Sequence, residues 1–233
     1  RAAPRYALAW GYRADANRAR ELRDDALRDY NKAFELDRSY TYAALSLIDM
    51  HLENSDPSEA EAVLTAATDI PPDLALGNQV RIDVARRKLD AAVENLDRLC
   101  QMPISDEDSL RMAIADMWDA NYAQEAYNVL RKWCLDEIAS PLVALVWVHA
   151  GTLLDKTSDV ARTIDRAAAN TPQWHSAAQR YLQALGSVKA KGKVVKFLRK
   201  HAALIDADDA TWAEAGDALY QCEDRQAAID MLF

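Results

Sequence analysis

The histidines of this 233-residue chain are few and widely separated. They are His51, His149, His175 and His201. No two of them form the i, i+4 pair with an intervening glutamate that zinc hydrolases use. The histidines therefore predict neither a metal nor hydrolytic chemistry, and we expect them in a binding groove or at interfaces.

The cysteines indicate no reactive or structural centre either. Cys100, Cys134 and Cys222 are three in number, do not suit a disulfide framework and lack the close spacing of a zinc site. Cys100 and Cys134 lie 34 residues apart, which suggests small buried side chains at equivalent places. The pattern favours a reducing compartment such as the cytoplasm, with no metal and no cofactor.

Phosphate and carboxylate chemistry are also disfavoured. The stretch "GSVKAKGK" separates its glycines by five residues where a phosphate loop has four, and Val194 follows where a metal-binding hydroxyl is needed. The acidic runs "SDEDS" and "DADDA" stand at expected turns before helices, where carboxylates cap exposed backbone N–H groups. We therefore expect no enzyme activity.

Composition indicates a helical globular chain. Apolar residues make up 50% and charged residues 28%, with only 6 glycines and 7 prolines. The most apolar stretch, from Pro141 to Leu154, is too short for a membrane span. The net charge of −9 argues against nucleic acid as a partner.

A pattern of apolar residues recurs along almost the whole chain, with a period of 34 residues and one step of 32. Its anchor positions are Ala26, Ala60, Ala92, Ala126, Val160, Val194 and Ala228. Four residues later stand Tyr30, Leu64, Leu96, Leu130, Ile164, Leu198 and Leu232. Seven residues after each of the first six anchors the stripe continues, from Ala33 to His201, which predicts one buried helical face per unit.

The rest of each unit predicts a partner helix and a stop. Trp212 and Gly216 in the last unit, like Trp10 and Ala14 in the first, pair a bulky residue with a small one a turn later, so two helices can approach closely. Prolines after the stripe, such as Pro72 and Pro172, should close the second helix. Helix, tight turn, helix is the expected unit.

These offsets resemble the signature of the tetratricopeptide repeat family, in which tryptophan, glycine, alanine, an aromatic residue and proline recur every 34 residues. The resemblance implies an all-α, right-handed superhelical solenoid of antiparallel helix pairs. The expected units of this single array are residues 7–40, 41–72, 73–106, 107–140, 141–174, 175–208 and 209–233. The apolar ending "AAIDMLF" suggests self-association there, or a longer parent protein.

In proteins similar to this one, the first helix of each pair lines a groove that holds a partner peptide. The resemblance places in that groove Asp15, Tyr42, Asp49, Arg81, Arg111, Trp118, His149, Gln179, Gln183 and Asp217. Of these, Arg81, Arg111, Trp118 and His149 fall in consecutive middle units. They could bind a carboxylate and stack an apolar group, with Asp49 and Tyr42 beside them. The alternative is that Trp118 packs between units and the arginines balance the acidic surface.

One basic segment stands apart in the acidic chain. It holds Lys189, Lys191, Lys193, Lys196, Arg199 and Lys200. The segment could bind an acidic peptide, a phosphate or a membrane face, although a solvated outer helix face is favoured.

The sequence thus favours a noncatalytic scaffold that binds a peptide or protein segment in a groove. The alternative is a repeat arm that positions a substrate or partner for a larger enzyme or secretion assembly.

Overall fold

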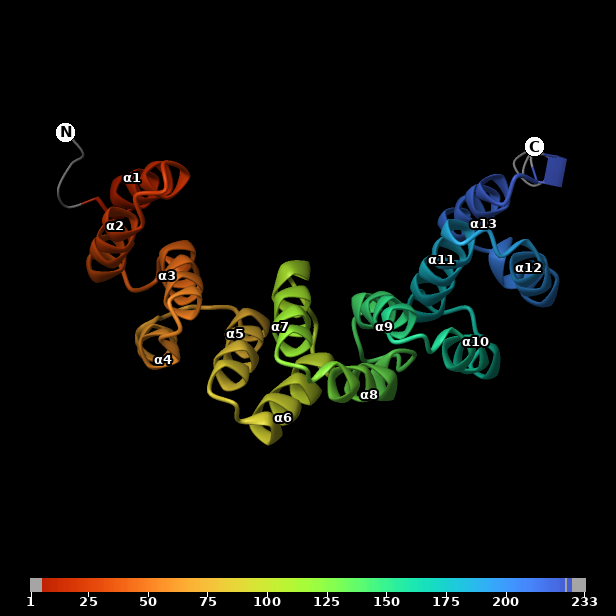
Figure 1. The fold of residues 1–233 in the computed structure, drawn as a ribbon, viewed down its shortest axis with the longest axis horizontal. Helices are drawn as coiled ribbons and strands as arrows, with labels where there is room; N and C mark the ends of the chain where they lie inside the picture. The colour runs from red at the N-terminus through yellow and green to blue at the C-terminus, as the bar shows by residue number, and fades with distance from the viewer. Residues whose placement is uncertain (1–5, 225, 228–233) are drawn as a thin grey trace. The chain divides into compact units, whose positions relative to one another are not determined.

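The computed structural model describes residues 6–224, 226 and 227, and every regular element in that part of the chain is an α-helix (Figure 1). In order, the thirteen helices placed there are α1 (Ala7–Ala19), α2 (Arg23–Leu36), α3 (Thr41–Glu53), α4 (Pro57–Ala66), α5 (Pro72–Ala85), α6 (Leu89–Cys100), α7 (Glu107–Asp119), α8 (Ala123–Trp133), α9 (Pro141–Leu153), α10 (Thr157–Arg166), α11 (Pro172–Ser187), α12 (Lys191–Ile205) and α13 (Asp209–Gln221). The expected all-α class is confirmed for these residues. None of these helices has the length and apolar character needed to cross a membrane.

The turn between paired helices has the same backbone conformation each time. A non-glycine residue with positive φ occurs at Glu21, Ser55, Arg87, Asn121, Asp155, Lys189 and Glu223, always five residues before an anchor position. In the second of these turns, the Ser55 N–H donates to the Leu52 carbonyl at 2.9 Å and the next N–H donates to the His51 carbonyl at 2.8 Å. Equivalent bonds form at the turns of Glu21, Arg87, Asp155, Lys189 and Glu223. The helix ends are thus closed by one recurring motif.

These left-handed residues provide a stability test. Arg87 has φ 58° and an exposed side chain, and an L-residue there costs roughly 1–2 kcal/mol that glycine avoids. We expect Arg87→Gly to raise the free energy of unfolding by about 1 kcal/mol in urea denaturation, after the entropy cost of glycine. The same change at exposed Glu94 inside α6 should lower it by about 1 kcal/mol. A loss of stability in Arg87→Gly would contradict this reading of the turn.

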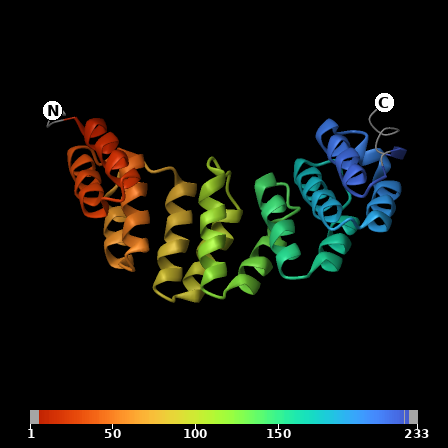
Figure 2. The same ribbon diagram turned by 45° about the horizontal axis from the view of Figure 1, so that its top comes forward.

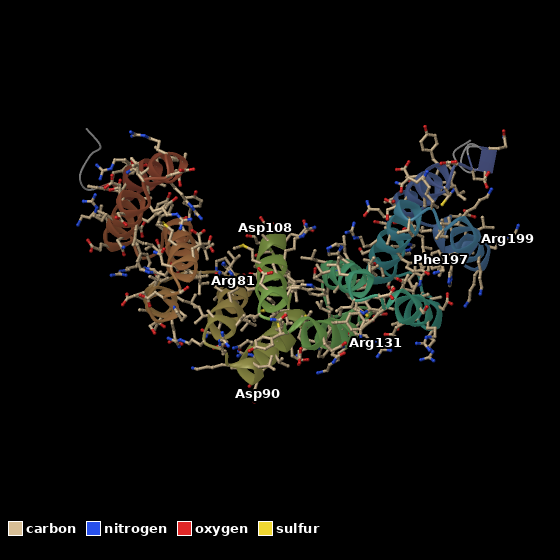
Figure 3. All side chains as sticks on the ribbon, in the orientation of Figure 1. Arg81, Asp90, Asp108, Arg131, Phe197 and Arg199 are labelled. Carbon is tan, nitrogen blue, oxygen red and sulfur yellow. The ribbon has the colours of Figure 1, made fainter. Side chains whose placement is uncertain are left out.

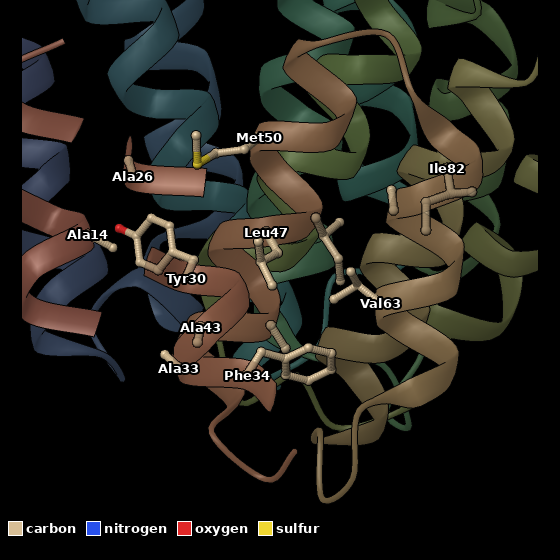
Figure 4. Close-up of a cluster of buried hydrophobic side chains, with 13 residues drawn as sticks. Ala14, Ala26, Tyr30, Ala33, Phe34, Ala43, Leu47, Met50, Val63 and Ile82 are labelled. Atoms are coloured by element: carbon tan, nitrogen blue, oxygen red, sulfur yellow. The ribbon is translucent and has the colours of Figure 1, made fainter. Parts of the chain in front are cut away.

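The chain divides into two compact units, residues 1–99 with 108–120, and residues 100–107 with 121–233. In unit 1, α2 packs against α1 and α3, and α3 packs against α4 and α5. Alanines with no exposed surface, including the anchors Ala26 and Ala60, let these helices approach closely. Tyr30, Phe34 and Leu47 fill the space between them, as Figure 4 shows.

In unit 2, α9 packs against α8, α10 and α11, and α11 packs against α12 and α13 (Figure 2). Trp147 and Trp174 are fully buried in this unit. Gly151 marks a close helix contact, because a Cβ there would lie 2.5 Å from Val160 Cγ2 and 3.1 Å from Tyr127 Cε2. In unit 2, α9 and α11 therefore each contact their own second helix and the first helix of the next pair.

The anchor positions of the expected stripe that the structure describes are buried, but some of the positions seven residues after an anchor are not. The six anchors from Ala26 to Val194 are all buried. Ala167, seven residues after Val160, is exposed because α10 ends at Arg166. In α4 the equivalent Ala67 is likewise the residue after the helix. Short second helices thus reach only two positions of the stripe.

The prolines act differently from the expectation. α4 ends at Ala66 and α10 at Arg166, several residues before Pro72 and Pro172. These prolines are instead the first residues of α5 and α11. Proline suits that position because its missing N–H needs no partner there and its φ is already helical. They open the next first helix rather than close the preceding second helix.

The end of the last expected unit lies outside the described residues. Ala228, Leu232 and most of the apolar ending fall there. Self-association through that end, and the repeat-arm alternative that it motivated, therefore stay predictions.

Candidate protein-binding surface

Arg81 is the centre of a charged cluster on the first helices of unit 1. Its Nε donates to Asp116 Oδ2 at 2.8 Å, and its Nη1 donates to Asp49 Oδ1 at 2.6 Å and to Asn78 Oδ1 at 3.0 Å. We call Asp49, Asn78, Arg81 and Asp116 the Arg81 cluster. Burial by itself lowers the pKa of Arg81, but the two carboxylates outweigh it and raise that pKa above its usual value. The guanidinium therefore stays charged.

This geometry changes the role that the sequence suggested for Arg81. Its side chain is only 10% exposed, whereas those of Asp49 and Asp116 are 25% and 36% exposed. The arginine expected to meet a partner's carboxylate is already matched by two carboxylates of its own chain. What reaches the surface at this point is acidic.

A second cluster surrounds Asp15 of α1. The Tyr42 hydroxyl of α3 donates to Asp15 Oδ1 at 2.8 Å, and the Tyr30 hydroxyl of α2 donates to the same oxygen. Tyr40 lies over Gly11, where a Cβ would come within 2.7 Å of the Tyr40 hydroxyl. Burial, followed by the bond to Asp15, raises the pKa of Tyr30, while the bond to Asp15 is the main cause of the raised pKa of Tyr42. These phenols remain protonated donors at neutral pH.

Tyr12 completes this group, which we call the Asp15 cluster: Tyr12, Asp15, Tyr30, Tyr40 and Tyr42. Tyr12 precedes Asp15 by three residues on α1, so both lie on one face of that helix. Tyr12 is 68% exposed and Tyr42 is 50% exposed. The cluster thus presents two tyrosine rings to solvent beside a carboxylate.

Helix α3 joins the two clusters. Tyr42, Ser46 and Asp49 are spaced i, i+4, i+7 and therefore share one face of the helix. At 1.5 Å per residue, Tyr42 and Asp49 are separated by about 10 Å along the axis. The Asp15 cluster and the Arg81 cluster therefore both include residues from one face of α3.

Of the other expected groove residues, Arg111 and Trp118 lie on α7, His149 lies on α9, Gln179 and Gln183 lie on α11, and Asp217 lies on α13. Arg111 is exposed and Trp118 partly buried, seven residues apart on α7. His149 belongs to unit 2, where its Nδ1 lies 2.7 Å from Arg180 Nη2. Arg180 Nη1 also donates to Gln183 on the same helix, α11. The structure thus groups His149 with Arg180 and Gln183, and groups Arg81 with Asp49 and Asp116.

The residues that the sequence did not single out are Asp116, Arg180 and the tyrosines Tyr12, Tyr30 and Tyr40. A signal for the tyrosines was available, because Asp15 and Tyr42 both fell on expected groove positions. The sequence gave no such signal for Asp116. It lies ten residues before its anchor, whereas the expected groove position of Arg81 lies eleven residues before the anchor.

The basic segment is largely solvated. Lys189, Lys191 and Lys200 form ion pairs with Glu223, Asp224 and Asp165. The side chains of Lys193, Lys196 and Arg199 are exposed, and Figure 3 shows Arg199 on the outer side of α12. Three of the six basic residues therefore form ion pairs with carboxylates of unit 2, and the other three are exposed.

Two of the histidines expected in a groove or at interfaces, His175 and His201, are buried between helices of unit 2. His175 lies 3.1 Å from Thr211 Oγ1 and 2.8 Å from Asn170 Oδ1. His201 Nε2 lies 2.7 Å from Asp165 Oδ1. Each buried ring has at least one polar partner in unit 2, so both act as structural polar groups.

All three cysteines are buried, and none of them forms a disulfide within the described residues. Burial raises the pKa of Cys134 to about 12 and also raises that of Cys222. A nucleophilic cysteine needs a lowered pKa and some exposure, so the environments of these two thiols are those of unreactive residues.

Asp208 caps α13 and gives a pH-dependent test. It accepts bonds from the Thr211 N–H at 2.8 Å and the Thr211 hydroxyl at 2.6 Å, which lower its pKa. Because its folded-state pKa lies below the unfolded one, the stability it adds is present above pH ~4 and is lost as pH falls. We expect Asp208→Ala to cost about 1–2 kcal/mol at pH 7 in chemical denaturation. The two proteins should converge near pH 2, and an equal cost at both pH values would contradict the carboxylate's role.

A depression in unit 1 lacks the features of a ligand site. It has a volume of about 530 Å³ and lies beside Trp10. Its cations are already matched, with Arg13 paired to Asp29 and Arg28 to Asp25. No unpaired charge remains there to select a small molecule.

Comparison with known proteins adds no family to this picture. No protein-family model matches the chain, and no curated protein matches it in sequence. Within the part of the chain that the structure describes, no three His, Cys, Asp or Glu side chains are grouped to hold a metal ion. Functional inference therefore depends on the two units and their surfaces.

Proposed function

We propose that this protein is a noncatalytic scaffold, a tetratricopeptide-like solenoid whose first helices bind a peptide or protein segment. The observation that carries the proposal is the placement of polar side chains at one recurring position of the first helices. Asp15, Asp49, Arg81, His149 and Gln183 all stand eleven residues before an anchor, and each contacts a side chain of another helix or of the next turn.

The second helices support the proposal in a different way. Their anchor faces are buried against the first helices, so they hold the first helices in place. Partner recognition commonly uses a few exposed tyrosine, tryptophan and arginine side chains. Tyr42, Arg111 and Trp118 supply these types on first helices. A solenoid of this kind binds by a surface and needs no catalytic group.

Site-specific photocrosslinking would test the proposal. A benzophenone amino acid replaces Tyr42 or Trp118 on first helices and, as controls, exposed Arg28 or Lys196 on second helices. In extract of the source cells, we expect the first-helix positions to crosslink a discrete protein and the controls to crosslink none. Equal crosslinking from both sets, or none from the first helices, would refute this mode of binding.

A further inference from the structure

The Asp15 carboxylate has hydrogen bonds but no ionic partner. Tyr30 and Tyr42 both donate to its Oδ1. Within the described residues, no Lys, Arg or His side chain forms an ion pair with Asp15. The nearby cations of α1 pair with other carboxylates, Arg13 with Asp29 and Arg18 with Glu53. The second oxygen of a partly exposed carboxylate is therefore available for a bond from outside.

The surrounding rings suit a cation. Tyr40 and Tyr42 have ring centroids 6.1 Å apart with a 34° tilt, and Tyr30 meets Tyr42 edge to face at 6.4 Å. A cation on Asp15 would lie beside Tyr42, whose hydroxyl is 2.8 Å from the carboxylate. Aromatic faces attract Lys and Arg side chains within about 6 Å of the ring centroid.

The wider surface has the complementary charge. The Arg81 cluster contains the two carboxylates of Asp49, on α3, and Asp116, on α7. Both pair with the one cation of Arg81, so the cluster has one negative charge in excess. Asp15 adds another on the same face. An approaching basic segment is favoured over an acidic one by this field.

We propose that the Asp15 cluster is a binding site for an arginine or lysine side chain of the partner segment. This inference rests on the proposed function and names its ligand chemistry. The cation bonds to Asp15 and packs on the exposed rings of Tyr12 and Tyr42, while Tyr30 and Tyr40 hold the carboxylate and the ring of Tyr42 in place.

Selection from a random displayed peptide library tests this site without a known partner. The expected result is recovery of peptides that share one arginine or lysine. Their affinity should fall at least about tenfold for Asp15→Asn, which loses a charge-assisted bond but keeps the side-chain shape. Asp24→Asn, at an exposed acidic residue of α2, is the control with the same change in net charge and should bind as the wild type does.

Tyr12→Ala is the second test, because this exposed residue can change without opening the core. It should weaken the same peptides by several-fold through loss of the cation–π contact. Melting curves of both variants check the fold, and if Asp15→Asn melts early, Tyr12→Ala decides.

The outcomes separate the two proposals. Selected peptides without a shared basic residue, or with unchanged affinity for both variants, would overturn the Asp15 site and leave the scaffold in place. If the library yields no peptide and the photocrosslinker on the first helices captures nothing, both proposals fail.

Discussion

Replacing Trp174 by alanine should destabilise the protein by about 3–5 kcal/mol, the largest effect that we expect from a single change. Trp174 of α11 is fully buried, and its indole N–H donates to the Ile164 carbonyl at 3.3 Å. Its ring stacks on Phe197 of α12 with centroids 6.3 Å apart and packs edge-on against His201 at 5.4 Å. Alanine leaves a cavity where α10, α11 and α12 meet.

Urea denaturation followed by circular dichroism measures this loss. Trp212→Ala on α13 is the matched control, because that tryptophan is partly exposed and its removal should cost clearly less. Equal losses for the two variants, or a loss below about 1 kcal/mol for Trp174→Ala, would mean that this core does not hold unit 2 together.

Arg81→Met should cost about 3 kcal/mol, the second largest effect. The change keeps much of the buried aliphatic volume but leaves Asp49 and Asp116 facing each other without a cation. Both carboxylates are partly exposed, so water can hydrate them, and we take the low end of the range for a broken buried pair.

A triple variant separates charge from packing. Arg81→Met combined with Asp49→Asn and Asp116→Asn removes the uncompensated charges and should recover more than half of the lost stability. Arg86→Met is the control. The Arg86 side chain pairs with Glu61 and is 19% exposed, against 10% for Arg81, so its replacement should cost at most about 1 kcal/mol. If the triple variant is no more stable than Arg81→Met, the cluster contributes through packing alone.

Much of the local structure could be predicted from the sequence. The period of the apolar residues depends on which face of a helix is buried, so the sequence predicts that the anchors from Ala26 to Val194 lie in the core, and they do. The same period placed the turns, since Glu21 to Glu223 follow it with the same 34- and 32-residue steps. The role of Pro72 could not be predicted in this way. A proline between two helices can follow the end of the first or begin the second, and in the sequence the two cases look alike.

The surface was harder to predict because its properties depend on pairs of residues. Arg81 read alone is a cation suited to a partner's carboxylate, but Asp49 and Asp116 from two other helices neutralise it. Asp15 read alone is one acidic residue among many, whereas Tyr30, Tyr40 and Tyr42 give it a defined environment. Contacts between helices decide which groove positions are open, and one sequence does not specify them.

Chemical-shift mapping by NMR with a peptide selected from the library would show which helices bind the peptide. We expect the largest shift changes in α1, α3 and α5, with Tyr12, Tyr42 and Asp49 among the affected residues, and small changes in α2 and α4. Changes concentrated in α2 and α4, or spread evenly over the molecule, would contradict binding by the first helices.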